Sequence, residues 1–158
     1  MVAAKLDFKK TKESIILGVK KTFEEMAFID VTLLKNPENN IDFKHILYVD
    51  ILEPVIGKIA LYLPFECKKM IAENVYGKDL TELNTDEIDD CQLEILNVLV
   101  GNYLSFLYGG RKKYKIDLPR ILFDEGELHW KKSTSHSLYF DAEGVMFKVV
   151  VDFKNTNR

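Results

Sequence analysis

Two short segments of the sequence repeat each other at a distance of 91 residues. HILYVD begins at His45 and HSLYFD begins at His136, and four of the six residues agree. Each segment lies in a run rich in β-branched and aromatic residues that is interrupted by turn formers, which predicts a β-hairpin. A helical pattern and a shorter strand pattern precede each hairpin. A fixed offset between similar units indicates an internal duplication, so we expect two copies of a helix, strand and hairpin unit.

The length of the chain fits one domain that contains both copies. We expect a single domain over residues 1–158, because a chain of this size can bury a core without disulfides or metals. The copies span about 11–63 and 86–153, and a connector helix of about 64–77 begins at a proline and ends before a glycine. In the second copy we expect one strand from Tyr114 to Phe123. The predicted fold is α+β, with a largely antiparallel sheet and long helices packed on it.

Composition argues against several classes of function. The net charge of −3 offers no broad basic field, so we expect no nucleic-acid partner. The longest apolar run is interrupted by Asn97 and Asn102 and falls short of the roughly 20 residues that span a bilayer, so we expect no membrane segment. The first residues lack the apolar core of a signal peptide, which predicts a cytoplasmic location. Cys67 and Cys91 match no zinc or disulfide motif and are expected to be reduced, buried thiols.

The long helix of the second copy carries a polar stripe on an otherwise apolar surface. Asn84 or Thr85 can cap this helix. Because each helical residue advances by about 100°, Asp90, Glu94, Asn97 and Gly101 fall within an arc of roughly 60°. Asparagine and glycine are both poor helix formers, and a glycine on this face leaves space for a partner to approach. The alternative is that the stripe is simply the solvent-facing side of a core helix.

The stripe carries a resemblance to a known family. Asp90, three residues, Glu94, two residues, Asn97, and then Gly101-Asn102 resemble the signature of the CheC, CheX and FliY family of chemotaxis phosphatases. The order of predicted elements is similar to the duplicated architecture of that family, and FEEMAFIDV, in the first copy, resembles CheX sequences in particular. The first helix offers no second Glu and Asn pair, since Ile16 follows Glu13 and Ala27 follows Glu24 at that spacing. One site per chain is the CheX-like pattern.

The resemblance implies a substrate, a mechanism and partners. The substrate would be the aspartyl phosphate of a CheY-like response-regulator receiver domain. Asn97 would position the attacking water, Glu94 would pair with the receiver's active-site lysine, and Asp90 and Gly101 would contact the partner. The resemblance further implies a homodimer. The chain would have no cofactor or metal of its own, because the Mg²⁺ would belong to the receiver and acids in a first helical turn are ordinarily partners of the helix dipole.

Two other functions remain open from the sequence. One is a non-catalytic adaptor module of the same fold that binds a receiver or the flagellar switch. Retention of both Glu94 and Asn97 argues against this alternative, because an adaptor has no need of the amide. The other is a dimeric sensor domain, which a bound small molecule would reveal.

Overall fold

The structure is a computed structural model that describes residues 8–35, 37, 43, 45–110, 113–124, 126, 128 and 135–153. These residues form three α-helices and one seven-stranded antiparallel sheet. The elements are α1 (Phe8–Ala27), β1 (Val31–Leu33), β2 (His45–Glu53), β3 (Gly57–Leu63), α2 (Phe65–Tyr76), the 3₁₀ turn η1 (Leu80–Glu82), α3 (Thr85–Tyr108), β4 (Lys115–Ile116), β5 (Arg120–Leu122), β6 (Ser135–Ala142) and β7 (Val145–Phe153). The predicted α+β class is confirmed.

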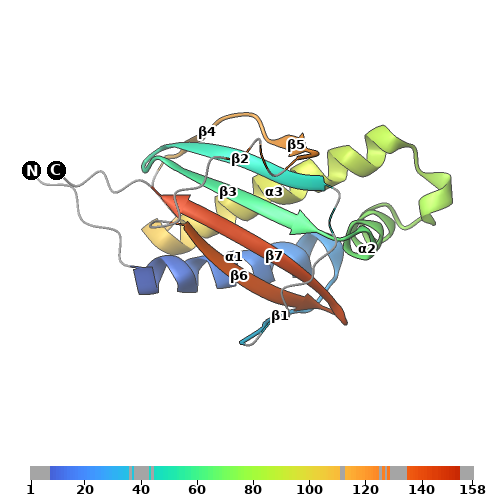
Figure 1. The fold of residues 1–158 in the computed structure, drawn as a ribbon, viewed down its shortest axis with the longest axis horizontal. Helices are drawn as coiled ribbons and strands as arrows, with labels where there is room; N and C mark the ends of the chain where they lie inside the picture. The colour runs from blue at the N-terminus through green and yellow to red at the C-terminus, as the bar shows by residue number, and fades with distance from the viewer. Residues whose placement is uncertain are drawn as a thin grey trace, which may run out of the picture.

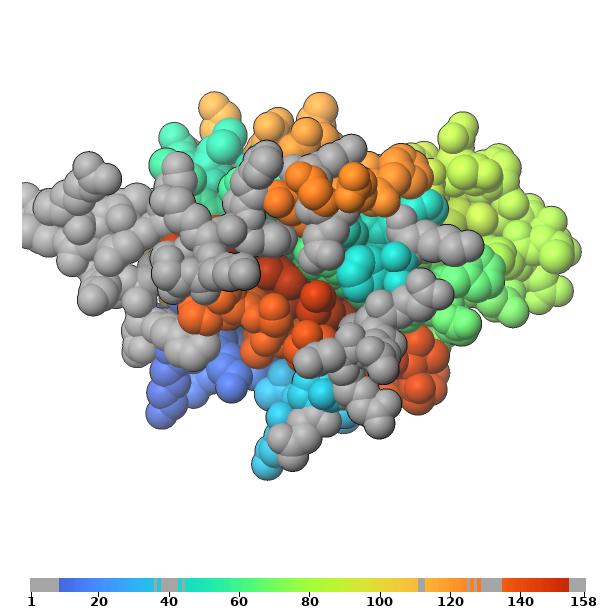
Figure 2. Space-filling model, viewed as in Figure 1, coloured from blue at the N-terminus to red at the C-terminus, as the bar shows by residue number. Residues whose placement is uncertain are grey.

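The helices cover one face of the sheet. Figure 1 shows α1 and α3 side by side behind the strands, with α2 at one end of the sheet. The main core lies between these helices and the sheet. A smaller cluster that includes Tyr48 and Tyr62 lies on the opposite face, which Figure 2 views directly. At the end near α2, η1 and the first turns of α3 extend past the sheet and leave this part of α3 accessible.

The strand order makes the predicted duplication visible. The order is β1-β6-β7-β3-β2-β4, and β5 also pairs with β2. Strands β3 and β7, the last of each copy, pair at the centre, from Gly57 opposite Phe153 to Tyr62 opposite Lys148. The first strand of each copy pairs with the hairpin of the other copy: β1 with β6, and β4 and β5 with β2. Two copies therefore build one sheet by exchanging their first strands.

Residues that match across the repeat also occupy matching environments. Leu47 and Leu138 are 91 residues apart, as are Val49 and Phe140. All four are buried in the core beneath the helices. Since side chains alternate between the two faces of a strand, this agreement means that both hairpins present the same side of the repeated segment to the helices.

One predicted element is wrong in its extent. The single strand expected from Tyr114 to Phe123 is split into β4 and β5. Pro119 has no N–H to donate to a strand ladder. Just before it, the Asp117 carboxylate accepts a hydrogen bond from the N–H of Leu118 at 2.8 Å, and the pairing with β2 shifts register between Ile51 and Glu53. The chain therefore bends at Asp117 to Pro119 and pairs with β2 twice.

Candidate active site

The helix that carries the polar stripe is fixed at both ends. Asn84 is its N-cap: its side-chain oxygen accepts from the N–H of Glu87 at 2.8 Å, and the Glu87 carboxylate accepts from the N–H of Asn84 at 3.2 Å. This capping box satisfies two donors that the helix leaves unpaired. At the other end Gly109 adopts a left-handed conformation (φ 84°) that few residues other than glycine tolerate. Asn84 is one of the two N-caps that the sequence predicts.

Burial of the rest of α3 turns the polar stripe outward. Nine residues of α3 are buried, among them Ile95, Leu99 and Tyr103. On the stripe, Asp90 and Glu94 are exposed and Asn97 and Gly101 are half-buried. The stripe therefore faces away from the core. Its chemistry is available to a partner.

Hydrogen bonds hold α1 close to α3 behind this stripe. The Asn102 side-chain amide donates to the Thr22 hydroxyl at 2.9 Å, and that hydroxyl donates to the Gly18 carbonyl at 2.6 Å. Gly18 itself lies against the backbone of Tyr103. Asn102, which follows the stripe in the sequence, thus ties the two helices together, and its amide is already engaged.

Three of the four residues of the stripe share one groove. This groove, of about 400 Å³, is lined by Glu94, Asn97, Val98, Gly101, Asn102, Ser105 and Tyr114, and we call it the Asn97 groove. Asp90 lies one turn before Glu94, outside the lining. The structure therefore brings Glu94, Asn97 and Gly101 together. Asp90 is left as an exposed flanking acid.

The Asn97 amide has no internal hydrogen bond at its oxygen. Its Oδ1 atom is buried and lacks a partner among the described residues. A buried polar atom left unpaired ordinarily costs about 1 to 3 kcal/mol. Among the described residues four side-chain atoms are in this position, on Thr11, Gln92, Asn97 and Tyr103, and of these residues Asn97 is the one that lines the groove. Within the described part of the chain Glu94 makes no ion pair either. Neither group has a partner among the described residues. The Glu94 carboxylate is exposed, whereas the buried Asn97 oxygen reaches a partner only if the amide rotates.

Tyr114 is the lining residue that the sequence did not predict. It follows α3, is 46% exposed, and places its hydroxyl over Gly101, where an added Cβ would lie 2.9 Å from the Tyr114 Oη atom. The space that Gly101 leaves is therefore occupied by a side chain of the same protein. The glycine on the stripe was the available signal for a close approach, but it does not identify which residue approaches.

The residues near the stripe do not resemble a metal centre. Across the described ranges, no group of three or more His, Cys, Asp or Glu side chains could hold a metal ion.

Cys67 and Cys91 are free and buried. Burial raises the pKa of the Cys67 thiol to about 12 and that of Cys91 to about 11, so both stay protonated and unreactive near neutral pH. None of the described helices is long and apolar enough to span a membrane.

Solved structures share this architecture. A CheX chemotaxis protein from Desulfovibrio desulfuricans is similar with a TM-score of 0.76 at 16% identity, covering 92% of this chain and 99% of that one. The CheX in a CheX–CheY–BeF₃–Mg²⁺ complex from Borrelia burgdorferi has a TM-score of 0.67 at 15% identity, covering 92% and 98%. FliY from Thermotoga maritima has a TM-score of 0.56 at 18% identity, covering 93% and 91%. At these identities the likeness concerns the fold alone.

Sequence comparison with a family model supplies what the fold cannot. No curated protein sequence matches the chain. The model of the family described as chemotaxis phosphatase CheX matches residues 46–142, over half of the chain. The match runs from the second residue of β2 to the end of β6, so it includes the polar stripe but not β7. The chain therefore belongs to the CheX family of chemotaxis phosphatases.

Proposed function

We propose that this protein is a phosphatase that hydrolyses the aspartyl phosphate of a CheY-like receiver domain, with Asn97 and Glu94 as its catalytic residues. The observation that carries the proposal is the pair itself: an unpartnered amide and an unpaired carboxylate lie one turn apart in the Asn97 groove. The solved complex of a similar CheX with CheY and Mg²⁺ supports the class of partner. The protein would act in the cytoplasm.

The chemistry requires little more than placement of a water molecule. The water oxygen attacks phosphorus in line, the bond from phosphorus to the aspartate oxygen breaks, and a carboxylate and a dihydrogen phosphate ion result. The carboxylate is a good leaving group, so no general acid is needed. A catalyst gains rate chiefly by holding the water in the attack position.

Asn97 suits this role because its amide can accept a hydrogen bond from water. The oxygen makes no hydrogen bond to the described residues, so a half turn about the Cβ–Cγ bond, which exchanges the amide oxygen and nitrogen, breaks no bond at the oxygen. When a receiver covers the groove, the amide enters its active site and orients the water. An amide has no basic group at neutral pH, so Asn97 positions the nucleophile without deprotonating it.

Glu94 supplies orientation through charge. Its carboxylate is exposed, one turn before Asn97 on the same face. An ion pair with the receiver's active-site lysine would set the register of the complex, and the charge of Asp90 on the flank would add to the attraction. The Mg²⁺ would be bound by the receiver, so the chain would contribute side chains but no cofactor. Gly101, with Tyr114 over it, would form the floor of the contact.

Phosphate release from a phosphorylated, Mg²⁺-bound receiver of the same organism tests the proposal. We expect wild type to accelerate release and Asn97→Ala to lose about 100-fold or more of that acceleration, as expected when a reacting group is misplaced. Glu94→Ala should weaken receiver binding, and raising the salt concentration should reduce the difference from wild type. Lys20→Ala, which alters an exposed residue of α1 outside this groove, is the control and should behave as wild type.

Stability separates a catalytic role from a structural one. Asn97→Ala removes a poor helix former and an unpaired buried oxygen, so its free energy of unfolding should equal or exceed that of wild type. Loss of helical circular dichroism in this variant would make Asn97 structural. Binding of receivers without acceleration of hydrolysis would instead establish the adaptor function.

A further inference from the structure

A second cavity lies between α2, α3 and the start of β2. Its volume is about 510 Å³, within the range of small-molecule sites, and it shares no lining residue with the Asn97 groove. Part of its wall is apolar and includes Leu63, Leu80 and Ile88. His45, Lys68 and Asp89 form the polar part. We call it the α2–α3 cavity.

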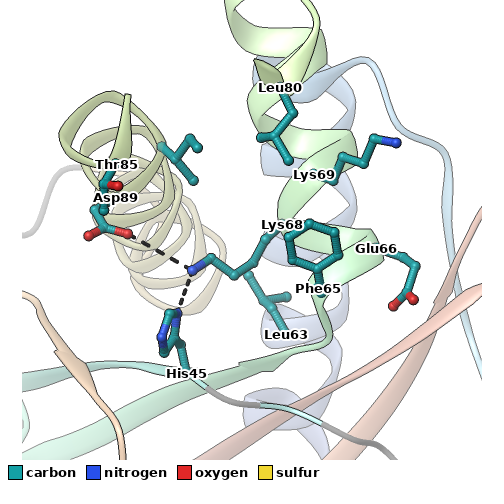
Figure 3. Close-up of a pocket in the computed structure, with 10 residues that line it drawn as sticks. His45, Leu63, Phe65, Glu66, Lys68, Lys69, Leu80, Thr85 and Asp89 are labelled. Atoms are coloured by element: carbon teal, nitrogen blue, oxygen red, sulfur yellow. Dashed lines mark hydrogen bonds and ion pairs between the residues drawn. The ribbon is translucent and has the colours of Figure 1, made fainter. Parts of the chain in front are cut away.

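Lys68 is the charged group that reaches into this cavity. In Figure 3 its side chain extends toward His45 and Asp89, whereas Lys69 and Glu66 point away from this group. Its Nζ atom lies 2.6 Å from His45 Nδ1, to which it donates, and 3.9 Å from the nearer Asp89 oxygen. The Lys68 side chain is only 12% exposed.

The ammonium of Lys68 is poorly compensated where it lies. It has three donors, and the distance to Asp89 is too long for a hydrogen bond, so His45 is its one hydrogen-bond partner among the described residues. Burial lowers the pKa of Lys68 below the ordinary value of lysine, and the charge of Asp89 offsets part of that shift. A lowered lysine pKa means that the charged form destabilises the folded state at neutral pH. An anion placed beside Nζ would remove this cost.

The start of α2 adds a second positive feature to the same wall. Its N-cap is Pro64, which makes no side-chain capping bond. The first N–H groups of a helix have no intrahelical acceptor and form the positive end of its dipole. Phe65 and Glu66, the first residues of α2, line the cavity together with Lys68. The helix end and the ammonium both favour an anion, whereas the Glu66 carboxylate, which points away from Lys68, opposes one.

We propose that the α2–α3 cavity binds a small organic anion, a carboxylate on an apolar body, with the carboxylate on Lys68 and the body against Leu63, Leu80 and Ile88. A site with an apolar wall and one convergent charged group selects for both halves of such a molecule. Asp89, 32% exposed at the edge of the cavity, opposes the anion and limits its affinity. This binding is independent of the phosphatase proposal.

Calorimetric titration with three eight-carbon probes, octanoate, octanol and octylammonium, tests both halves of the proposal. Octanoate should bind about tenfold or more tightly than octanol, since only octanoate makes a charged contact, and octylammonium should bind weakest. Lys68→Met should reduce octanoate affinity by about tenfold or more. Asp89→Asn should increase octanoate affinity.

Lys78→Met is the matched control, because it removes the same charge from an exposed lysine just after α2 that does not line the cavity. It should leave octanoate binding as in wild type.

Lys68→Met should fold at least as stably as wild type at pH 7, so lost binding cannot be ascribed to unfolding. The excess in free energy of unfolding of Lys68→Met over wild type should shrink as the pH rises from the pKa of Lys68 in the folded protein toward its pKa in the unfolded chain. Equal affinity for octanoate and octanol, equal losses in Lys68→Met and Lys78→Met, or no octanoate binding at about 10 mM would overturn the proposal. Phosphate release is a separate readout and is not needed for any of these outcomes.

Discussion

The Tyr114 hydroxyl explains why a glycine stands at position 101, inside a helix. A glycine in the interior of a helix costs up to about 1 kcal/mol relative to alanine. At position 101 an added Cβ would lie 2.9 Å from the Tyr114 hydroxyl oxygen but 3.7 Å from the ring carbon that bears it. The hydroxyl alone therefore makes the contact too tight. Gly101 therefore lowers the stability of the helix but leaves room for the Tyr114 side chain, which lines the same groove as Asn97.

This pair predicts that two substitutions are not additive. Gly101→Ala introduced into Tyr114→Phe should raise the free energy of unfolding by up to about 1 kcal/mol, because helix propensity is gained and the contact at 3.7 Å is ordinary. In wild type the same change should gain less, since the tyrosine must move. Urea denaturation of the four proteins measures this coupling. Equal gains in both backgrounds would show that the hydroxyl imposes no constraint.

At the residue scale, the sequence predicts which side chains group together on one helix, but not which side chains meet from several elements. Glu94, Asn97 and Gly101 share a face because helical periodicity fixes their relation. Tyr114 comes from beyond the end of α3, and the α2–α3 cavity joins His45, Lys68 and Asp89 from three elements. Such groupings depend on tertiary packing, which a periodic pattern does not encode. The roles of Glu94, Asn97, Asp90 and Gly101 stay predictions until activity is measured.

Among the elements, the crossing of α1 and α3 controls how the stripe is presented. A Cβ at Gly18 would lie 3.1 Å from both the Cα and the N atoms of Tyr103. These are backbone atoms, so the helices can respond only by moving apart. The nearby hydrogen bond from Asn102 to Thr22 depends on the same close approach.

Gly18→Ala should therefore destabilise the protein by about 1 to 3 kcal/mol, although alanine is the better helix former. Lys20→Ala, at an exposed position of the same helix, should change stability by less than about 0.5 kcal/mol. Urea denaturation of both variants measures the difference. A Gly18→Ala variant as stable as wild type would mean that the helices separate without cost.

The elements themselves were largely predictable, for local reasons. Capping at Asn84, the glycine after α3 and the turn formers between strands act within a few residues. The hairpin β6–β7, which the sequence predicts, closes through Glu143 and Gly144, both at positive φ. The division of β4 from β5 was missed because Pro119 and Asp117 interrupt a segment whose composition otherwise favours one strand.

For the molecule as a whole, we propose a homodimer that uses the edge of the sheet formed by β4 and β5. Leu118, between these strands, is 79% exposed, and Phe123, just after β5, is 73% exposed. Apolar residues gathered at a sheet edge are typical of interfaces. Sedimentation equilibrium should return twice the chain mass of 18.3 kDa, and Leu118→Lys should reduce it toward that of a single chain.

Phe28→Lys is the control for this prediction. Phe28 is 72% exposed just before β1, the strand at the other edge of the sheet, and its replacement should leave the dimer intact. A single-chain mass at every concentration would exclude the dimer. Dissociation by Phe28→Lys alone would place the interface at the β1 edge.

The exchange of first strands has a consequence for how such a chain can arise. A half-length ancestor with one helix, one short strand and one hairpin could complete this sheet only by pairing with a second copy of itself, each lending its first strand to the other. Fusion through a segment such as α2 makes the association permanent. The two halves then need no longer be identical. One helix could keep the Glu and Asn pair while the other, with Ile16 and Ala27 at the corresponding spacings, became free to serve only as its support.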